Sequence, residues 1–387
     1  MLIAALAAGF AAEGVDVVRL GVVPTPTVAF EAQRRSAIGA VVSASHNAYR
    51  DNGIKLFAVG GTKLPDAVES RIEEQLAATD AGGESASVGS ITFDPDHTAY
   101  AEHVLAALGG RRLEGLHVVV DTANGAACEL APVVLREAGA EVTVVADRPD
   151  GRNINHGCGA TFPSAVADAV VECGADVGIA LDGDADRLIA VDHTGSVVDG
   201  DHIIAICAGD LRSRGALAHD AVVVTVMTNL GFHLAMREAG IEVVQTAVGD
   251  RYVLAALAEG GYSLGGEQSG HVIFTDHATT GDGILTALVL LDVVARRGPL
   301  AELASAAMTS LPQVLRNVEV ASRVGDVSGE LSADIDAVER RLGERGRVLV
   351  RASGTEPLIR VMVEAETADD AESAVAELVA AVHRRFG

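Results

Sequence analysis

The chain has 387 residues, with 54 acidic side chains against 29 basic ones and a formal charge of −25. Nucleic acids and anionic membranes are therefore poor partners, because binding a phosphate backbone requires clustered Lys and Arg. No apolar run approaches the roughly 18 residues of a membrane-spanning helix. The four cysteines have no C-x-x-C spacing that would indicate a zinc site or a disulfide scaffold, and a cytoplasmic protein is expected.

Three stretches of the chain resemble one another and predict a repeated unit. Residues 11–18, 135–145 and 236–244 each read as a helix end, a glycine and a short β-branched strand. Further strands with turns precede the second and third copies, at 118–125 and 222–231. This order predicts βαβ units, and so largely parallel sheets flanked by helices. Because the first copy has no preceding strand, we expect the front of the first domain to be missing.

The residue pattern changes after about position 310. Alternating apolar residues predict strands, and a 3.6-residue period predicts helices. The strands are expected at 314–320, 347–351 and 358–364, and the helices at 330–342 and 369–386. This part is predicted to be a separate small α+β domain.

The first chemically informative loop follows an apolar strand at 38–42. It reads Ser43-Ala44-Ser45-His46-Asn47-Ala48, and Lys55 comes soon after it. A serine at a strand end with His, Asn and Lys nearby is a candidate nucleophile. The loop is no G-x-S-x-G elbow, because Ser43 and Asn47 stand where that turn has glycines. The alternative is that these polar residues only cap and turn the chain.

The second loop contains Asp182, Asp184 and Asp186. Alternate positions of an extended backbone point to one side, so these carboxylates predict a site for a hard cation such as Mg²⁺. A calcium EF-hand is excluded, because Arg187 takes the position of its required glycine and His193 that of its final glutamate. A solvated loop is the weaker alternative, since three adjacent carboxylates repel one another without a cation.

The third loop is the glycine-rich segment 265–271, followed by Thr279-Thr280-Gly281-Asp282-Gly283. Its glycines allow a ligand to approach the backbone, while Glu267, Ser269 and His271 can hydrogen-bond to sugar hydroxyls. A tight polar turn would explain the same residues.

The fourth loop, at 351–357, is followed closely by Arg360. Two arginines, two hydroxyls and a glycine are typical of an anion-binding cradle. Because the G-K-[ST] of a nucleotide P-loop is absent, a phosphate on a small molecule fits better than ATP. The alternative is a β-turn with solvated arginines. The residues of this cradle are Arg351, Ser353, Gly354, Thr355 and Arg360.

Together the four loops indicate phosphoryl transfer on a phosphorylated sugar. The sequence resembles the α-D-phosphohexomutase superfamily, and within it the branch of bacterial phosphoglucosamine mutases. The resemblance runs in order over essentially the whole chain. It is carried by S-A-S-H-N with D-N-G-I-K, G-T-K-L-P-D, N-I-N-H-G-C-G-A-T, D-G-D-A-D-R, T-V-M-T-N-L-G, V-G-D-R-Y-V, G-G-E-Q-S-G-H and R-A-S-G-T-E-P-L-I-R-V-M-V-E. Sister mutases usually carry a different residue where Gln268 stands.

The resemblance implies an α/β fold of three similar α/β/α domains, with mixed, largely parallel sheets, and a C-terminal α+β domain around a central cleft. The expected domains are 1–97, 98–196, 197–309 and 310–387. It also implies an isomerase that interconverts glucosamine 6-phosphate and glucosamine 1-phosphate through a phosphoserine and a 1,6-bisphosphate. This reaction would feed UDP-N-acetylglucosamine and cell-wall synthesis.

The resemblance further implies a role for each loop. Ser45 would carry the phosphoryl group and, with Asp182, Asp184 and Asp186, hold one Mg²⁺. Arg187 would neutralise the phosphoryl group, and Glu267 and Ser269 would bind sugar hydroxyls. The cradle residues Arg351, Ser353, Gly354, Thr355 and Arg360 would hold the other phosphate. Lys55 is the candidate for handling the sugar hydroxyl's proton, with His271 as second candidate and His46 beside the serine.

The chain departs from the family pattern at three places. Ala48 replaces a proline, which loosens the serine loop, and Ala185 replaces a glycine, which fits if no positive φ is required there. The family's N-terminal G-T-D-G-x-R-G segment and the strand after it are absent, so the chain is expected to start late or to be truncated. The alternatives are a phosphomannomutase or phosphoglucomutase, or an inactive form that binds sugar phosphates. The resemblance suggests a homodimer and a glucose or glucosamine 1,6-bisphosphate activator.

Overall fold

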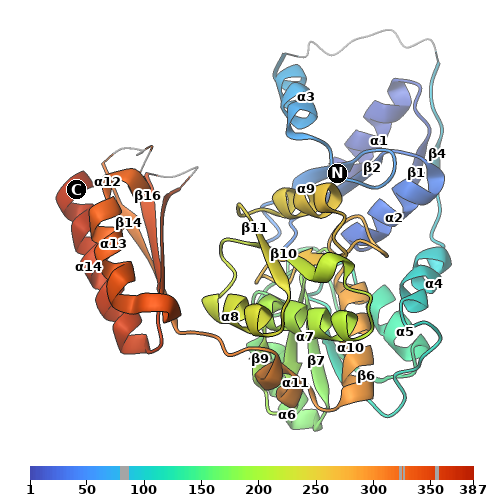
Figure 1. Ribbon diagram of the computed structural model, residues 1–387. Coiled ribbons are helices and arrows are strands. Elements are labelled where there is room, and N and C mark those ends of the chain that lie inside the picture. Colours follow the sequence, from blue (N-terminus) through green and yellow to red (C-terminus); the bar gives the residue numbers. More distant parts are fainter. Residues whose placement is uncertain (79–86, 322–324, 326, 354–356) are drawn as a thin grey trace. The chain divides into compact units, whose positions relative to one another are not determined.

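A computed structural model of the chain describes residues 1–78, 87–321, 325, 327–353 and 357–387 (Figure 1). The chain forms two compact units. The first contains residues 1–227 and 241–307, and the second contains 228–240 and 308–387. Within the described residues, every helix is too short or too polar to cross a bilayer.

The N-terminal part of the first unit places the serine loop between two paired strands. Strand β2 pairs antiparallel with β3, and β1 pairs parallel with β4. Buried Val28 and Ala29 of α2 pack against Val41 and Phe57 of the β2–β3 pair. The elements are α1 (Leu2–Ala12), β1 (Val17–Arg19), α2 (Thr25–Arg35), β2 (Gly39–Ser43), β3 (Gly53–Phe57), α3 (Asp66–Ala78) and β4 (Ile91–Phe93).

The middle of the first unit is a five-stranded mixed sheet with the order β6-β5-β7-β8-β9. Strand β5 pairs parallel with β6 and β7, whereas β7–β8 and β8–β9 are antiparallel. The elements are α4 (Thr98–Ala106), β5 (His117–Asp121), α5 (Leu130–Glu137), β6 (Glu141–Val145), α6 (Ser164–Cys173), β7 (Val177–Leu181), β8 (Leu188–Asp192) and β9 (Val197–Val198).

Strands β7 and β8 are buried along their whole length, as apolar runs covered on both faces require. Helix α6 packs through Val166 and Val170 on the face that carries Ala180 and Val191. Helix α10 (Gly283–Arg297) also packs against β7 and β8, and the turn between these strands carries the three aspartates. The acidic turn therefore joins the ends of two fully buried strands.

The last part of the first unit is a four-stranded sheet with the order β11-β10-β12-β13. Strand β10 pairs parallel with β11 and β12, and β12 pairs antiparallel with β13. The elements are α7 (Gly200–Ser213), η1 (Ala218–Asp220), β10 (Ala221–Thr225), β11 (Glu242–Thr246), α9 (Asp250–Gly260), β12 (Leu264–Gly266), β13 (Val272–Phe274), α10 (Gly283–Arg297) and α11 (Leu300–Ala307).

The second unit is an antiparallel sheet, β14-β16-β15, with helices α12, α13 and α14 packed on one face. It also contains α8, which Asn229 ties to it by donating to the Leu311 carbonyl over 3.0 Å. The elements are α8 (Leu230–Glu238), β14 (Gln313–Glu319), α12 (Val327–Glu330), α13 (Ser332–Leu342), η2 (Gly343–Arg345), β15 (Arg347–Ala352), β16 (Leu358–Glu364) and α14 (Ala368–Phe386).

The predicted fold class is confirmed, because the chain combines mixed, mostly parallel sheets with helices and ends in an α+β unit. The repeated motif is visible in the structure. Helices α5 and α8 are each followed by a glycine in the left-handed region, Gly139 at φ 104° and Gly240 at φ 66°, and then by a strand. Only glycine adopts this turn without strain, which explains its recurrence at these places. The four domain boundaries stay a prediction.

Candidate active site

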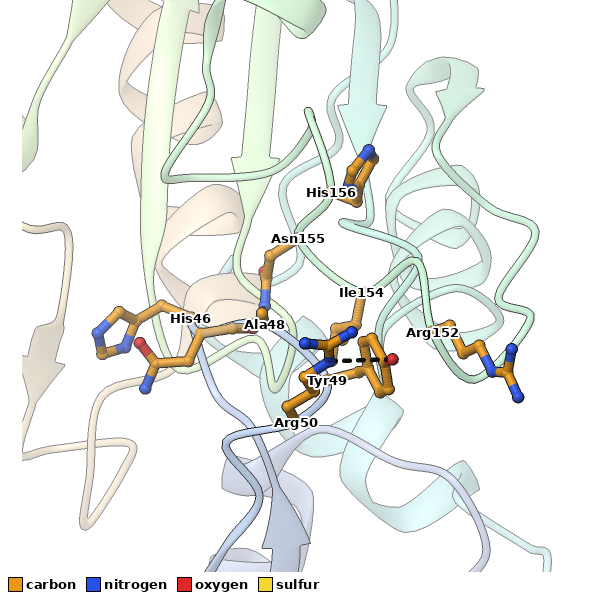
Figure 2. Close-up of a pocket in the computed structure, with 9 residues that line it drawn as sticks. His46, Ala48, Tyr49, Arg50, Arg152, Ile154, Asn155 and His156 are labelled. Carbon is orange, nitrogen blue, oxygen red and sulfur yellow. Dashed lines mark hydrogen bonds between the residues drawn. The ribbon is translucent and has the colours of Figure 1, made fainter.

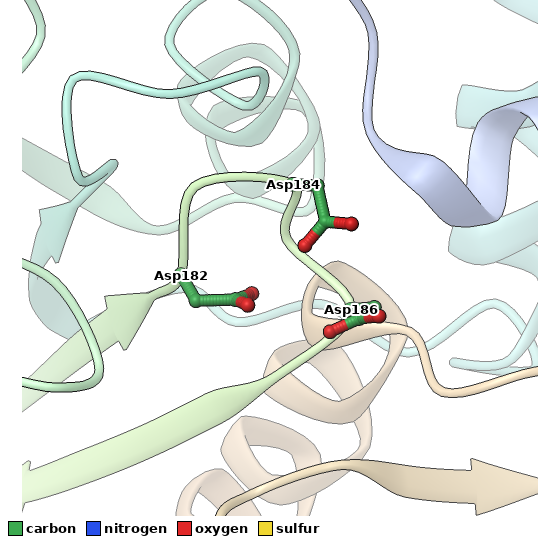
Figure 3. Close-up of side chains that lie close together, drawn as sticks. All are labelled: Asp182, Asp184 and Asp186. Carbon is green, nitrogen blue, oxygen red and sulfur yellow. The ribbon is translucent and has the colours of Figure 1, made fainter. Parts of the chain in front are cut away.

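Asp182, Asp184 and Asp186 lie on the tight turn that joins β7 to β8 (Figure 3). The prediction of an extended backbone is wrong here, because residues 183–186 form turns and bends. Ala185 lies at φ 56°, so the position does have the positive φ that a glycine would accept without strain. The carboxylates converge because the turn folds back, and not because alternate residues share a face.

The three carboxylates fit a hard cation. Each offers an oxygen, and these oxygens lie within 4.8 Å of one another. The Oδ1 atoms of Asp184 and Asp186 are buried and have no hydrogen-bond partner among the described residues. Unpaired buried carboxylate oxygens are costly, and oxygen ligands are those that Mg²⁺ prefers. The residues therefore suit a divalent cation.

Asp182 is fully buried within this cluster. Burial raises its pKa well above the usual range, and the neighbouring Asp186 and Asp184 charges raise it further. Its Oδ1 accepts a hydrogen bond of 3.1 Å from the backbone N–H of Arg187. A bound cation would stabilise the charged form, so the electrostatics and the geometry both favour a metal-binding turn.

Two side chains from the N-terminal part of the chain hold the other two aspartates. Lys55 on β3 donates to Asp184 over 2.7 Å and to Asp186 over 2.9 Å. Thr25 at the start of α2 donates to Asp184 over 2.8 Å. Burial by itself lowers the pKa of Lys55, but the Asp186 and Asp184 carboxylates outweigh it and raise the pKa above its ordinary value. Lys55 is therefore held as an ammonium ion in this arrangement.

Ser45 lies directly beside the acidic turn. Its hydroxyl is 3.5 Å from Asp182 Oδ2 and 3.3 Å from His46 Nδ1. Burial and the Arg187 guanidinium lower the pKa of His46. The nearest ion-pair contact of Arg187 is long, with its Nε 3.9 Å from Asp186. The structure therefore brings the predicted Ser45, His46, Lys55 and Arg187 together around the three aspartates.

The predicted sugar-binding loop is the hairpin turn between β12 and β13. Glu267 accepts hydrogen bonds from the Gly249 N–H over 3.1 Å and from the Ser269 hydroxyl over 3.3 Å. The Gly270 carbonyl accepts from the N–H of Leu188, the residue that begins β8 after the acidic turn. This bond of 2.9 Å fixes the hairpin next to the aspartates.

His271 lies at the inner end of this loop and is only 2% exposed. Its Nδ1 is 3.6 Å from Asp186 and its Nε2 is 3.8 Å from Asp250. Asp250 in turn pairs with Lys63. His271 is thus a buried link between the acidic turn and a second acid–base pair, and this depth limits its direct access to a sugar.

The predicted phosphate cradle lies in the second unit. Arg351 on β15 and Arg360 on β16 face each other as direct cross-strand neighbours, and neither has a carboxylate within ion-pair distance in the described part of the chain. Burial and the charge of Arg360 lower the pKa of Arg351. Like charges opposite each other are unfavourable, so this pair suits a bound anion. Ser353 is buried beside them, and Gly354 and Thr355 lie outside the described residues.

Several residues of this region were not identified from the sequence. Thr25 is bonded to Asp184, Asp250 pairs with Lys63, and Asn155 donates to the backbone of the serine loop. Asp184 lies 159 positions after Thr25 in the sequence, so local spacing carries no signal for the contact. The P-T-P-T run at residues 24–27, where α2 begins, is the one pattern that marks Thr25.

The serine loop and the 152–156 segment together line a cavity of about 300 Å³ (Figure 2). Its lining includes His46, Tyr49 and Arg50 on one side and Arg152, Asn155 and His156 on the other. The Arg50 and Arg152 side chains point in different directions and do not converge on one point.

Comparisons with family descriptions cover most of the chain. Four parts of the phosphoglucomutase/phosphomannomutase family match in order: alpha/beta/alpha domain I at residues 1–82, domain II at 98–195, domain III at 199–311 and the C-terminal domain at 306–381.

Known proteins agree with this match. The phosphoglucosamine mutase of Frankia alni is 58% identical, over 98% of this chain and 84% of that protein. The phosphoglucosamine mutase of Thermobifida fusca is 55% identical, over 98% and 85%.

Solved structures show the same fold. A phosphoglucomutase/phosphomannomutase family protein of Burkholderia thailandensis has a TM-score of 0.82 at 28% identity, over 99% of this chain and 86% of that one. The Aspergillus fumigatus N-acetylphosphoglucosamine mutase in complex with GlcNAc-6P and magnesium has a TM-score of 0.69 at 22% identity, over 98% of both chains. The chain therefore belongs to the phosphoglucomutase/phosphomannomutase family.

Proposed function

We propose that the chain is a phosphoglucosamine mutase, an isomerase that interconverts glucosamine 6-phosphate and glucosamine 1-phosphate. The observation that carries the proposal is the Ser45 hydroxyl 3.5 Å from Asp182, within a cluster of three buried carboxylates. A phosphoryl-carrying serine beside a cation site is the arrangement that this transfer requires. The amino-sugar substrate is supported by relatives named phosphoglucosamine mutase at 58% and 55% identity.

Asp182, Asp184 and Asp186 would hold one Mg²⁺ together with the phosphate on Ser45. When bound, the cation supplies positive charge to the phosphoryl oxygens. The Arg187 guanidinium would neutralise the same phosphoryl group. Lys55 would keep the Asp184 and Asp186 carboxylates ionised and the turn ordered. The Aspergillus fumigatus enzyme was solved with magnesium, which supports this choice of metal.

In the first half-reaction, the C1 hydroxyl oxygen of glucosamine 6-phosphate bonds to the phosphorus on Ser45. The bond between that phosphorus and Ser45 Oγ breaks, and Oγ takes up a proton. The proton of the C1 hydroxyl leaves to a base, and Lys55 and His271 are the predicted candidates. Lys55 can accept this proton only after it gives up its own, because Asp184 and Asp186 hold it as an ammonium ion, and His271 is buried. The products are the 1,6-bisphosphate and free Ser45.

In the second half-reaction, the bisphosphate turns over and Ser45 Oγ bonds to the phosphorus at position 6. The proton of the Ser45 hydroxyl leaves to the base, the bond between that phosphorus and O6 breaks, O6 takes up a proton from that base, and glucosamine 1-phosphate leaves. Glu267 and Ser269 would bind the sugar hydroxyls in both orientations. The phosphate that is not transferred would be held by Arg351, Ser353, Gly354, Thr355 and Arg360.

The test is intact-mass analysis after treatment with glucose or glucosamine 1,6-bisphosphate, which we propose as activator. We expect the wild-type chain to gain one phosphate and Ser45→Ala to gain none. In a coupled assay, Ser45→Ala should retain less than about one thousandth of the wild-type rate, because a covalent nucleophile cannot be bypassed. A wild-type chain that takes up no phosphate would contradict the enzyme and favour an inactive sugar-phosphate-binding form.

The second candidate is a phosphomannomutase or phosphoglucomutase, favoured by the family description that matches the chain. Assays with glucosamine, mannose and glucose 6-phosphates separate these activities. Equal rates on all three would contradict the amino-sugar assignment. A homodimer, a cytoplasmic location and a role in supplying UDP-N-acetylglucosamine stay predictions.

A further inference from the structure

The backbone of the serine loop adopts a conformation that needs external support. Ser45 lies at φ 51°, in the left-handed region that costs a residue with a side chain roughly 1–2 kcal/mol. Its N–H donates to Ser43 Oγ over 2.9 Å. Its carbonyl oxygen packs so closely on Gly183 that a Cβ there would lie 2.5 Å away. The direction of the Ser45 hydroxyl therefore depends on what holds this peptide.

One side chain from another part of the chain holds it. The Nδ2 group of Asn155 donates to the carbonyl oxygen of Ser45 over 2.8 Å and to that of Asn47 over 2.8 Å. Both amide hydrogens are thus used on two alternate carbonyls of the serine loop. In Figure 2 the Asn155 side chain extends from its own segment to the loop near Ala48.

Asn155 is itself firmly placed. Its backbone N–H donates to the Ala123 carbonyl over 2.9 Å, next to the end of β5. It lies at φ 57°, a region that asparagine tolerates better than most residues. The position therefore combines two demands, a left-handed backbone and a planar group with two donors, that asparagine meets together.

We propose that Asn155 is a positioning residue for phosphoryl transfer. By holding the Ser45 and Asn47 carbonyls, it keeps the Ser45 hydroxyl at the three aspartates. It contacts the serine loop and not the reacting atoms. The inference rests on the proposed function, because it gives Ser45 the role of phosphoryl carrier. A residue of the predicted second domain would thus position the nucleophile Ser45 of the predicted first domain, 110 positions earlier in the sequence.

Two substitutions at this position test the proposal in the full-length chain. Asn155→Asp keeps the shape but replaces both donors with a carboxylate that repels the two carbonyl oxygens. Asn155→Gly accepts the positive φ and removes the side chain, so it leaves the backbone unstrained. We expect kcat to fall about 10- to 100-fold, because small misplacements of a reacting group carry such costs. The KM for glucosamine 6-phosphate should change less than about threefold.

The matched control is Asn153→Ala, two positions earlier in the same segment. The Asn153 side chain bonds to the backbones of Arg148 and Asp150, and within the described part of the chain it has no hydrogen bond to the serine loop. We expect it to keep the wild-type kcat. Hydrogen exchange of the peptide containing residues 44–48 provides a second readout. It should quicken in both Asn155 variants and stay unchanged in the control.

The outcomes separate the inference from the proposed function. If the wild-type chain is phosphorylated on Ser45 and active, and the Asn155 variants match its kcat, the inference is overturned alone. Loss of folded structure in both variants would also overturn it, because Asn155 would then serve the fold and not the transfer. If the wild-type chain takes no phosphate on Ser45, the proposed function fails and the inference fails with it.

Discussion

At the scale of single residues, both lysines of the chain lie in ion pairs at the candidate site. Lys55 pairs with Asp184 and Asp186, and Lys63 pairs with Asp250. An ammonium ion is a compact charge on a flexible stem, whereas a guanidinium is a planar fork. A narrow gap between two carboxylates therefore suits lysine, which offers a physical reason for lysine at position 55.

Ala185 shows how a small residue can occupy a glycine position at a cost. It is fully buried and lies at φ 56° in the acidic turn. The left-handed conformation costs roughly 1–2 kcal/mol, while its buried methyl group contributes about 0.8 kcal/mol. Glycine would remove the strain, but it would also lose the methyl group and gain chain entropy in the unfolded state.

These opposing effects give a prediction for Ala185. We expect Ala185→Gly to change the free energy of unfolding by less than about 1 kcal/mol, because relief of strain offsets the lost burial and the entropy cost. Ala185→Val should lower it by more than about 2 kcal/mol, since a branched side chain is strained and overpacked there. Thermal unfolding followed by circular dichroism checks both. Equal melting temperatures for the two variants would contradict the argument.

At the scale of elements, the N-terminus of α10 supports the acidic turn. The Gly283 N–H donates to the Ala185 carbonyl over 3.0 Å, and a Cβ at Gly283 would lie 2.5 Å from the Arg187 carbonyl. Asp282 caps the helix by accepting from the Leu285 N–H over 3.0 Å. It also accepts from the Tyr100 hydroxyl over 2.8 Å. The positive end of the helix therefore lies against the aspartates.

The cap residue gives a pH prediction. Burial raises the pKa of Asp282 to about 6, so the folded chain binds more protons than the unfolded chain between pH 3.8 and about 6. This group's contribution to stability is full below that window and is lost as the pH rises through it, by roughly 3 kcal/mol. When the pH is raised from about 4.5 to about 7.5, the melting temperature should fall less in Asp282→Asn than in the wild type, because asparagine does not titrate.

Asp199, the cap of α7, is the matched control because its pKa moves the opposite way. Burial by itself raises the Asp199 pKa, but the hydrogen bonds from His202 outweigh it and lower the pKa. Its contribution is present above the unfolded pKa and is lost as the pH falls. Asp199→Asn should therefore be destabilised most at neutral pH. An Asp282→Asn variant with the wild-type pH trend would show that Asp282 is not the titrating group.

At the scale of the whole molecule, the two units have separate cores. The second unit has its own cluster of buried residues on β14, β15, β16 and α14, and it includes α8 from the middle of the chain. Asn229 both caps α8 and accepts from the Leu311 N–H over 2.9 Å. The third predicted domain, at 197–309, therefore contains a helix that packs with residues beyond it. The order of residues along the chain does not reveal that α8 packs with this later segment.

The charge of −25 gives a prediction for the molecule as a whole. Many ion pairs among the described residues involve exposed arginines, and such pairs contribute about 1 kcal/mol or less each. Net repulsion should therefore dominate the response to salt. We expect the melting temperature to rise by about 2 °C or more between about 20 and about 200 mM NaCl, as charges are screened. A falling melting temperature would show that ion pairs outweigh the repulsion.

Most elements of the second unit follow from local pattern. The predicted strands at 314–320 and 358–364 correspond to β14 and β16, and the predicted helix at 369–386 corresponds to α14. These predictions succeed because side chains alternate with a fixed period along strands and helices. The extended aspartate backbone failed because three carboxylates at alternate positions also fit a folded turn. Periodicity over five residues does not separate these two shapes.

The sequence by itself determined which residue types could carry phosphoryl chemistry and which strands and helices present them. Short motifs and apolar periodicity are both properties of neighbouring positions in the chain. The tertiary structure decided which of these side chains contact one another. Thr25 and Lys55 reach Asp184 across 159 and 129 positions, and Asn155 reaches Ser45 across 110. The tertiary structure also gives Ala185 a left-handed backbone conformation and places α8 in the second unit. Such contacts depend on how separate segments pack in space, which local spacing does not encode.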